Sequence, residues 1–311
     1  METESQEEIN TTHSHSLRLV KAEKSNIQKT LSVSIYESVD DEMKRSLDLA
    51  SEKGASIWLN TLPIKKLGFA LNKQEFQDAL AFRYNLKVQG MPPHCSCGAK
   101  NSCDHALVCR LGGYTIMRHN EVCDVEADLL REVCRDVQIE PALIPLSGQQ
   151  FTRSTNHQDM ARLDVSARGL WGPMEKAFFD VRIFHPNATS NRSKSLPQLY
   201  TSHEMEKKRT YNQRIIEVEH ATFTPLVFST SGGESLECKK FHKRLASLLT
   251  NRRGESYPET ITYIRRRIRF CILRTSLIAI RGYRKPKAQE TNATTPLYEV
   301  DISVSEAAHR R

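Results

Sequence analysis

The chain has 311 residues, of which 39% are hydrophobic and 26% are charged, a balance that allows a sizeable core. Its 45 Lys and Arg outnumber its 37 Asp and Glu, and the formal net charge of +8 favours polyanionic partners over a membrane. The longest late apolar stretch, residues 270–280, is about half a membrane span. The first 24 residues lack an apolar run, so we expect an intracellular protein, nuclear or cytoplasmic and not secreted, with reduced cysteines.

The N-terminal third is predicted to be loosely organised. Residues 1–50 are polar and weakly periodic, which indicates a disordered tail. Residues 51–90 predict a helical linker, with apolar side chains at helical spacing behind Asn72 as a candidate cap. A GMPP turn then separates this linker from a cysteine-rich segment.

Cysteine and histidine are concentrated in HCSCGAKNSCDHALVC, residues 94–109, inside a module predicted at 91–115. Zinc is held by four thiolate or imidazole donors from short loops. The predicted ligands are Cys95, Cys97, His105 and Cys109. His94 and Cys103 remain alternative ligands on spacing alone, and buried thiols without metal are the alternative to a zinc knuckle. A site with four protein ligands would be structural.

The remainder, 116–286, predicts an α/β domain in which helices pack on a sheet, followed by a flexible tail at 287–311. Apolar periodicity predicts these elements in order: a helix over 118–137 capped by Asn120, strands over 161–169 and 177–186, a helix over 203–219, a strand over 223–230, and basic helices over 235–250 and 258–281.

Two aspartates interrupt the predicted strands. Alternation places Asp180 and Arg182 on one face of 177–186, and Asp164 lies within 161–169. An antiparallel pair of these strands would bring the two carboxylates together, where they repel unless a cation lies between them. Mg²⁺ is the natural cation for such a pair and can activate a water against a phosphodiester. Two ordinary ion-paired aspartates are the alternative.

Phosphodiester cleavage also needs a positive donor. Arg182 and Lys207 are candidates, and Tyr211 lies one helical turn after Lys207, although a solvent-facing lysine is the alternative. Residues 240–285 contain 13 Lys or Arg against two Glu, which is typical of phosphate neutralisation. A solvated basic helix face would explain the same surplus.

The motifs occur in an informative order. A Cys-Cys-His-Cys knuckle is followed by RHN, RLDV, FFDVRIFHP, KKRTYNQR and FTPLVFSTSGG. This order resembles the C-terminal part of non-LTR retrotransposon polyproteins that carry a restriction-like endonuclease. The resemblance runs from about Trp58 to Arg284. It implies a restriction-endonuclease-like PD-(D/E)-x-K fold, with a mixed sheet flanked by helices, that cuts target DNA.

The resemblance also implies roles for single residues. Asp164 and Asp180 match the catalytic, magnesium-binding acids, with Leu163 in place of the family's proline. Lys207 matches a catalytic lysine that has moved onto a helix, with Lys208 as the alternative, and Tyr211 matches the tyrosine of that helix. The residues expected to contact nucleic acid are Arg118, His119, Arg182 and Tyr211.

About 90 residues precede the knuckle and contain no polymerase-like acid motif, so the reverse transcriptase of a full element is not expected here. We therefore expect a retrotransposon-derived, Mg²⁺-dependent DNA endonuclease domain with structural zinc and basic C-terminal helices that hold the duplex. The alternatives are a catalytically inactive zinc-dependent module that binds DNA or RNA, and a transposon remnant. The sequence leaves target specificity, RNA binding and the oligomeric state open.

Overall fold

The computed structural model describes residues 2–282, with side chains from Leu19 onward, so the expected tail at 287–311 lies outside the described residues. The helices are α1 (Glu2–Ser38), α2 (Asp41–Ser51), α3 (Lys73–Arg83), α4 (Cys103–Val108), α5 (Tyr114–Arg131), α6 (Leu196–Glu217), α7 (Leu236–Arg253) and α8 (Tyr257–Arg281), with short 3-10 helices η1 (Ile57–Asn60) and η2 (Lys65–Leu67). The strands are β1 (Arg135–Ile139), β2 (Val165–Arg168), β3 (Lys176–Phe184) and β4 (Thr222–Ser229).

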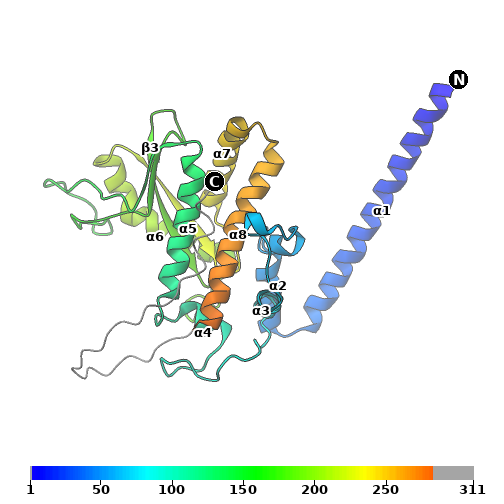
Figure 1. The fold of residues 1–311 in the computed structure, drawn as a ribbon, viewed down its shortest axis with the longest axis horizontal. Coiled ribbons are helices and arrows are strands. Elements are labelled where there is room, and N and C mark those ends of the chain that lie inside the picture. Colours follow the sequence, from blue (N-terminus) through cyan, green and yellow to red (C-terminus); the bar gives the residue numbers. More distant parts are fainter. Residues whose placement is uncertain (1, 283–311) are drawn as a thin grey trace.

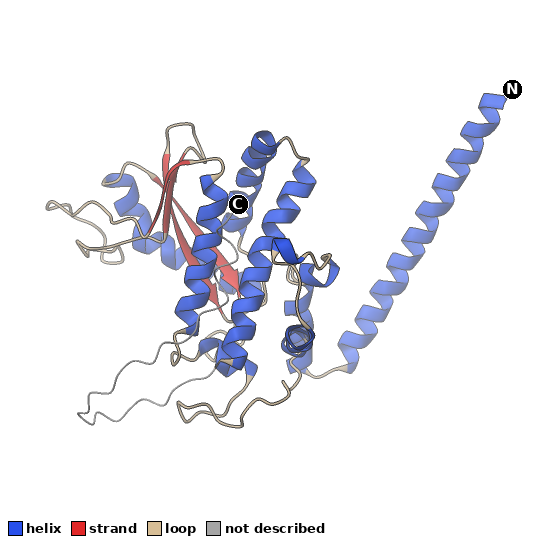
Figure 2. Ribbon diagram, in the orientation of Figure 1, coloured by secondary structure: helices blue, strands red, loops and turns tan. Residues whose placement is uncertain are grey.

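These strands form one mixed sheet in the order β1-β2-β3-β4. The first three pair antiparallel, and β4 lies parallel to β3 after the crossover through α6. Helices cover both faces, with α5, α7 and α8 on one side and α6 on the other (Figures 1 and 2). The α/β expectation is therefore confirmed at the level of a small mixed sheet flanked by helices.

The alternation of β3 divides the core between the two faces of the sheet. Phe179 and Val181 belong to the main core with apolar side chains of α5, α7 and α8. Phe178 points the other way and packs with Ile215 of α6 and Phe223 of β4. Asp180 shares the Phe178 face and is 4% exposed, so its carboxylate is buried on the side of the sheet that α6 covers.

The helix expected over 118–137 is two elements. α5 begins after Gly113, whose positive φ of 68° suits the left-handed backbone at this cap, and Asn120 lies inside the helix. The chain then turns into β1, an edge strand whose residues are mostly exposed. Residues 136–139, Asp-Val-Gln-Ile, alternate polar and apolar side chains, but this run is short and follows the helical period of α5 directly, so the pattern predicted a continuation of the helix.

Residues 1–50 were expected to form a disordered tail, but α1 and α2 occupy nearly all of this range. α1 projects away from the body (Figure 1), whereas α2 packs against it. Arg45 of α2 donates to the side-chain oxygen of Asn187 at 2.9 Å and to the carbonyl of Pro186 at 2.8 Å. The folded body therefore begins within α2.

The segment expected as a separate linker packs on the last described helix. Trp58 and Phe69 join Phe270 and Leu273 of α8 in one apolar cluster. The Asn72 cap is confirmed, because its side chain accepts a hydrogen bond from the Glu75 amide and Glu75 caps Asn72 in return. Residues 57–83 and α8 thus share a core.

The burial of α8 corrects the expectation that both basic helices present their cations to DNA. Ile268 lies in the main core, and Arg269 beside it is 2% exposed. Arg281 Nε donates to Asp78 Oδ2 at 2.6 Å. Part of the positive surplus therefore neutralises the protein's own carboxylates and is unavailable to phosphate.

A buried charge cluster joins three helices and the loop after β4. His242 of α7 lies 2.9 Å from Glu126 of α5 through Nε2 and 2.8 Å from Glu234 through Nδ1. Arg269 Nη2 lies 3.2 Å from the same Glu234 oxygen. Two carboxylates, an imidazolium and a guanidinium balance one another, which is what buried charges require. We call these four residues the buried charge cluster.

No helix in the described range 2–282 is both long enough and apolar enough to cross a membrane.

Candidate functional site

The four predicted zinc ligands converge in space. The ligand atoms of Cys95, Cys97, His105 and Cys109 all lie within 4.8 Å of one another. Cys95 Sγ is 3.9 Å from Cys109 Sγ, and Cys97 Sγ is 3.3 Å from His105 Nε2. Such separations suit a tetrahedral ion with bonds of about 2.0–2.3 Å. This Cys3His cluster could hold a zinc ion.

Local sequence explains this arrangement. Gly98 has φ of 88°, a left-handed conformation that favours glycine in the tight turn after Cys97. Ser102 then caps α4 by accepting a hydrogen bond from the His105 amide at 3.0 Å. The one-turn helix places His105 and Cys109 on the same side.

The two alternative ligands lie outside this cluster. Cys103 packs with Val88, Ala106 and Ile280, and burial raises the pKa of its thiol to about 11. His94 is exposed, and its backbone pairs with that of Lys100. Of the six candidates among residues 94–109, four therefore form the zinc-ligand cluster.

We expect about one zinc ion per purified chain, and a large loss of zinc in the Cys109→Ser variant, because a closed structural site needs all four ligands. Metal analysis after gel filtration measures this content. Cys134→Ser is the matched control, since Cys134 is half-buried and outside the cluster. Equal zinc in the two variants would contradict the assignment.

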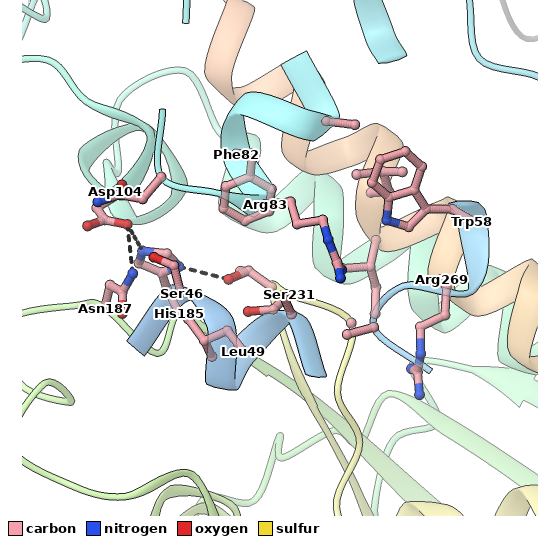
Figure 3. A pocket seen from close by; sticks show the side chains of 18 residues that line it. Ser46, Leu49, Trp58, Phe82, Arg83, Asp104, His185, Asn187, Ser231 and Arg269 are labelled. Atoms are coloured by element: carbon pink, nitrogen blue, oxygen red, sulfur yellow. Dashed lines mark hydrogen bonds and ion pairs between the residues drawn. The ribbon is translucent and has the colours of Figure 1, made fainter. Parts of the chain in front are cut away.

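Asp104 connects the zinc module to the sheet. Its Oδ1 accepts a hydrogen bond from His185 Nε2 at 2.8 Å, and Nδ1 of His185 then accepts from the Thr230 hydroxyl at 2.7 Å. Burial is the largest single influence and opposes the charge of Asp104, but the contacts with His185, Asn187 and Arg192 together outweigh it and lower the pKa of Asp104. Figure 3 shows Asp104, His185 and Asn187 meeting at one end of a pocket.

This pocket lies apart from the two predicted catalytic acids. Its lining includes Trp58, Phe82 and Arg83 from the segments that pack on α8, and His185 from the loop after β3 (Figure 3). Neither predicted acid is among its lining residues. The pocket and the pair of acids are therefore separate features of the molecule.

Asp164 and Asp180 meet where β2 and β3 pair. Val165 is opposite Phe179 in this antiparallel pair, so the next position along the register places Asp164 opposite Asp180. Asp164 Oδ2 accepts a hydrogen bond from the Val181 amide at 2.6 Å, which holds this carboxylate beside β3. The pKa of Asp180 is raised to about 6, mainly by burial and also by the charge of Asp164, while Lys207 opposes both effects. The two charges therefore act on each other.

Lys207 of α6 completes a charged contact with β3. Its Nζ lies 2.7 Å from Asp180 Oδ2. Burial disfavours its charge, but attraction to Asp180 outweighs burial and raises the pKa of Lys207. Lys208 points elsewhere, with Nζ 3.4 Å from Glu237 Oε1. Of the two candidate lysines, Lys207 is therefore the one beside the acids.

His119 also lies beside the acids, although the sequence suggested only a nucleic-acid contact. Its Nε2 is 3.1 Å from Asp164 Oδ2, and this hydrogen bond raises the pKa of the imidazole. Arg118 is 3% exposed, and its Nη2 donates to the Leu107 carbonyl at 3.0 Å. Burial lowers the pKa of Arg118 to about 10. Direct contact of Arg118 with nucleic acid is therefore not supported.

The other two expected contacts lie at the edge of this group. Arg182 is exposed and shares the Asp180 face of β3. Tyr211 is half-buried against Phe223, with Lys207 Nζ 5.7 Å from its ring centroid. Arg182 is therefore accessible from solvent, whereas Tyr211 is packed between Phe223 and Lys207.

Sequence reasoning assigned no role to Cys123, yet its Sγ lies 3.7 Å from His119 Nδ1 and 3.9 Å from Nε2. Burial, together with the charges of Asp164 and Asp180, raises the pKa of this thiol. The His-x3-Cys spacing on a helix could have indicated the pair, since residues four apart face the same side. We call His119, Cys123, Asp164, Asp180 and Lys207 the acid site.

No protein-family model matches this chain, and no curated protein matches it at a significant level.

Proposed function

We propose that the chain is a Mg²⁺-dependent DNA endonuclease domain of the restriction-like type, as its resemblance to non-LTR retrotransposon polyproteins implies. The observation that carries the proposal is the convergence of Asp164, Asp180 and Lys207 from β2, β3 and α6. Two acids and one lysine around a sheet are the catalytic set that the resemblance implies. The zinc-ligand cluster and the formal charge of +8 suit a nucleic-acid substrate.

The residues present fit a magnesium ion. Asp164 and Asp180 offer hard carboxylate oxygens, which Mg²⁺ prefers. The raised pKa of Asp180, about 6, indicates that Lys207 compensates its burial only partly, so a further cation would stabilise the carboxylate. When bound, Mg²⁺ supplies Lewis-acid polarisation of a phosphoryl oxygen and a more acidic water. Asp164 and Asp180 would hold it.

The chain's own cations have separate tasks in this proposal. Lys207 is within hydrogen-bond distance of Asp180, and an ammonium here orients the attacking water and stabilises the charge that develops on the phosphate. Arg182, exposed on the same strand face, neutralises a neighbouring phosphate and positions the duplex. Tyr211 packs beside Lys207 and restricts its rotamers.

We expect Lys207→Ala to reduce Mg²⁺-dependent plasmid nicking by about 10²–10³-fold, the usual cost of losing one transition-state donor. Lys208→Ala is the matched control, because Lys208 contacts Glu237 and should change nicking less than about threefold. Initial rates of supercoil loss measure both. Equal losses in the two variants would contradict the role of Lys207.

A non-catalytic nucleic-acid-binding module is the second candidate. It is favoured by the contacts of both carboxylates, since Lys207 Nζ already lies 2.7 Å from Asp180 and His119 lies 3.1 Å from Asp164. If Lys207 and His119 fully neutralise the two carboxylates, the fold is stable without a metal ion. Salt-sensitive DNA binding that needs no Mg²⁺, with no cleavage of any substrate, would support this candidate.

A further inference from the structure

One side of the acid site offers a different donor chemistry from the other. α5 presents His119 and Cys123 one turn apart, and both face Asp164. The imidazole, thiol and carboxylate each contribute a ligand atom, and these three atoms lie within 4.8 Å of one another. Lys207 and Asp180 lie on the other side, on α6 and β3.

We propose that His119, Cys123 and Asp164 form a second transition-metal site, selective for zinc-class ions and separate from the zinc-ligand cluster. It shares Asp164 with the proposed magnesium site. The two metals therefore compete for one carboxylate, and a zinc-class ion at this position inhibits cleavage. Metal binding stands independently of the proposed function, whereas the inhibition rests on it.

The geometry is close to that of a tetrahedral zinc ion. Bonds of about 2.3 Å to sulfur and 2.0 Å to nitrogen place the two ligand atoms about 3.5 Å apart, and nitrogen and carboxylate oxygen about 3.3 Å apart. Cys123 Sγ lies 3.9 Å from His119 Nε2, and that nitrogen lies 3.1 Å from Asp164 Oδ2. These two separations differ from the ideal values by about 0.4 and 0.2 Å, and the third pair of ligand atoms lies within 4.8 Å. The side chains of His119 and Asp164 are 34% and 20% exposed, so water can reach the fourth position.

The donor set decides which ions bind. Thiolate and imidazole favour Zn²⁺ and Co²⁺, whereas Mg²⁺ takes oxygen ligands. Binding forms the metal–sulfur and metal–nitrogen bonds and releases the thiol proton, with any proton on Nε2, to solvent. No oxidant or reductant is needed.

A comparison within the chain shows why this triad is favoured over another. Glu234, Cys238 and His242 also bring three ligand atoms within 4.8 Å. There, both ring nitrogens of His242 contact carboxylates, and Arg269 occupies the space beside Glu234. A metal would have to displace a balanced charge cluster. At His119, by contrast, Nε2 contacts a single carboxylate that can share the ion.

Cobalt titration of the full chain tests the site, because a Co²⁺–thiolate bond gives an intense near-ultraviolet band. With the zinc-ligand cluster first filled by one equivalent of Zn²⁺, we expect the wild type to bind one further Co²⁺ with a thiolate band. Cys123→Ser should lose this band and weaken binding more than about tenfold. Cys134→Ser is the matched control and should keep both the thiolate band and the affinity for Co²⁺.

The outcomes separate this inference from the proposed function. No second cobalt in the wild type, or an unchanged thiolate band in Cys123→Ser, would overturn the site. If Cys123→Ser does not fold, the His119→Asn variant takes its place. It must bind the second metal ion, Co²⁺, more weakly than the wild type while retaining the thiolate band. Inhibition is scored as the ratio of nicking with and without Zn²⁺ at about 10 µM, a concentration that fills a site whose Kd is about 1 µM. Absence of all nicking contradicts the nuclease but leaves the cobalt result intact.

Discussion

We expect Asp180→Asn to lose Mg²⁺-dependent nicking by about 10³-fold or more. Metal-ion stabilisation of the transition state is worth several kcal/mol, and each 1.4 kcal/mol corresponds to about tenfold in rate. The carboxamide preserves the shape of a side chain that is 4% exposed but removes its charge. Plasmid nicking at saturating Mg²⁺ measures the loss.

The matched control for this variant is Asp128→Asn. Asp128 is exposed on α5 and pairs with Arg131 at 2.6 Å, so its removal should leave the rate within about twofold. Thermal unfolding of both variants establishes that they fold. Equal nicking by wild type and a folded Asp180→Asn would reject the catalytic assignment of the acids.

The second large effect is on stability. We expect Glu234→Gln to lower the free energy of unfolding by about 3–5 kcal/mol, because removing one member of the buried charge cluster leaves uncompensated charge in the core. Arg269 and His242 both contact Glu234, and neither side chain is more than 2% exposed. Urea unfolding monitored by circular dichroism measures the difference.

The pH dependence of this effect has a defined sign. Although burial opposes its charge, attraction to Arg269 and His242 holds the pKa of Glu234 well below its ordinary 4.5. Its contribution is therefore present above pH 4.5 and is lost as the pH falls. The pKa of His242 is raised well above 6.5 despite burial, so its contribution is full below pH 6.5 and is lost only at higher pH. Glu234→Gln should flatten the acid limb of the stability profile.

Glu237→Gln provides the comparison, since Glu237 lies in the first turn of α7, three residues after Glu234. Its side chain is 25% exposed and pairs with Lys208 and Lys240 at 3.4 and 3.3 Å. Partly exposed pairs of this kind contribute about 0–1 kcal/mol. A loss in Glu234→Gln no larger than that in Glu237→Gln would contradict the importance of the buried charge cluster.

The predictable part of the fold is the part with a strong hydrophobic period. β3 and β4 were expected within two residues of their observed ends, since their apolar faces alternate or are wholly buried. α6 begins at Leu196 rather than 203, because its first turns follow a Ser195 capping box within a polar stretch. The apolar alternation of β1 spans only Val137 and Ile139, and α1 is polar over most of its length, so periodicity did not predict either element.

For the candidate site, the spacing of cysteine and histidine predicted the zinc-ligand cluster. Strand alternation predicted that the two acids lie together. The misjudged residues depend on tertiary contacts. Arg118 turns inward to the Leu107 carbonyl and His119 turns to Asp164, a difference of one residue, or about 100° around a helix. Their adjacency is visible in the sequence, whereas the rotation of α5 against the sheet is not. Lys207 and Lys208 could not be separated from sequence for the same reason.

The position of α8 has a consequence for the order of folding during synthesis. Trp58 and Phe69 find their apolar partners in Phe270 and Leu273, about 200 residues later in the chain. Contacts of such sequence separation are slow to form, and the early segments emerge from the ribosome at about 5–20 residues per second, well before their partner. For roughly ten seconds or more the N-terminal apolar surface has no native cover. The topology therefore leaves this surface open to aggregation while the rest of the chain is made.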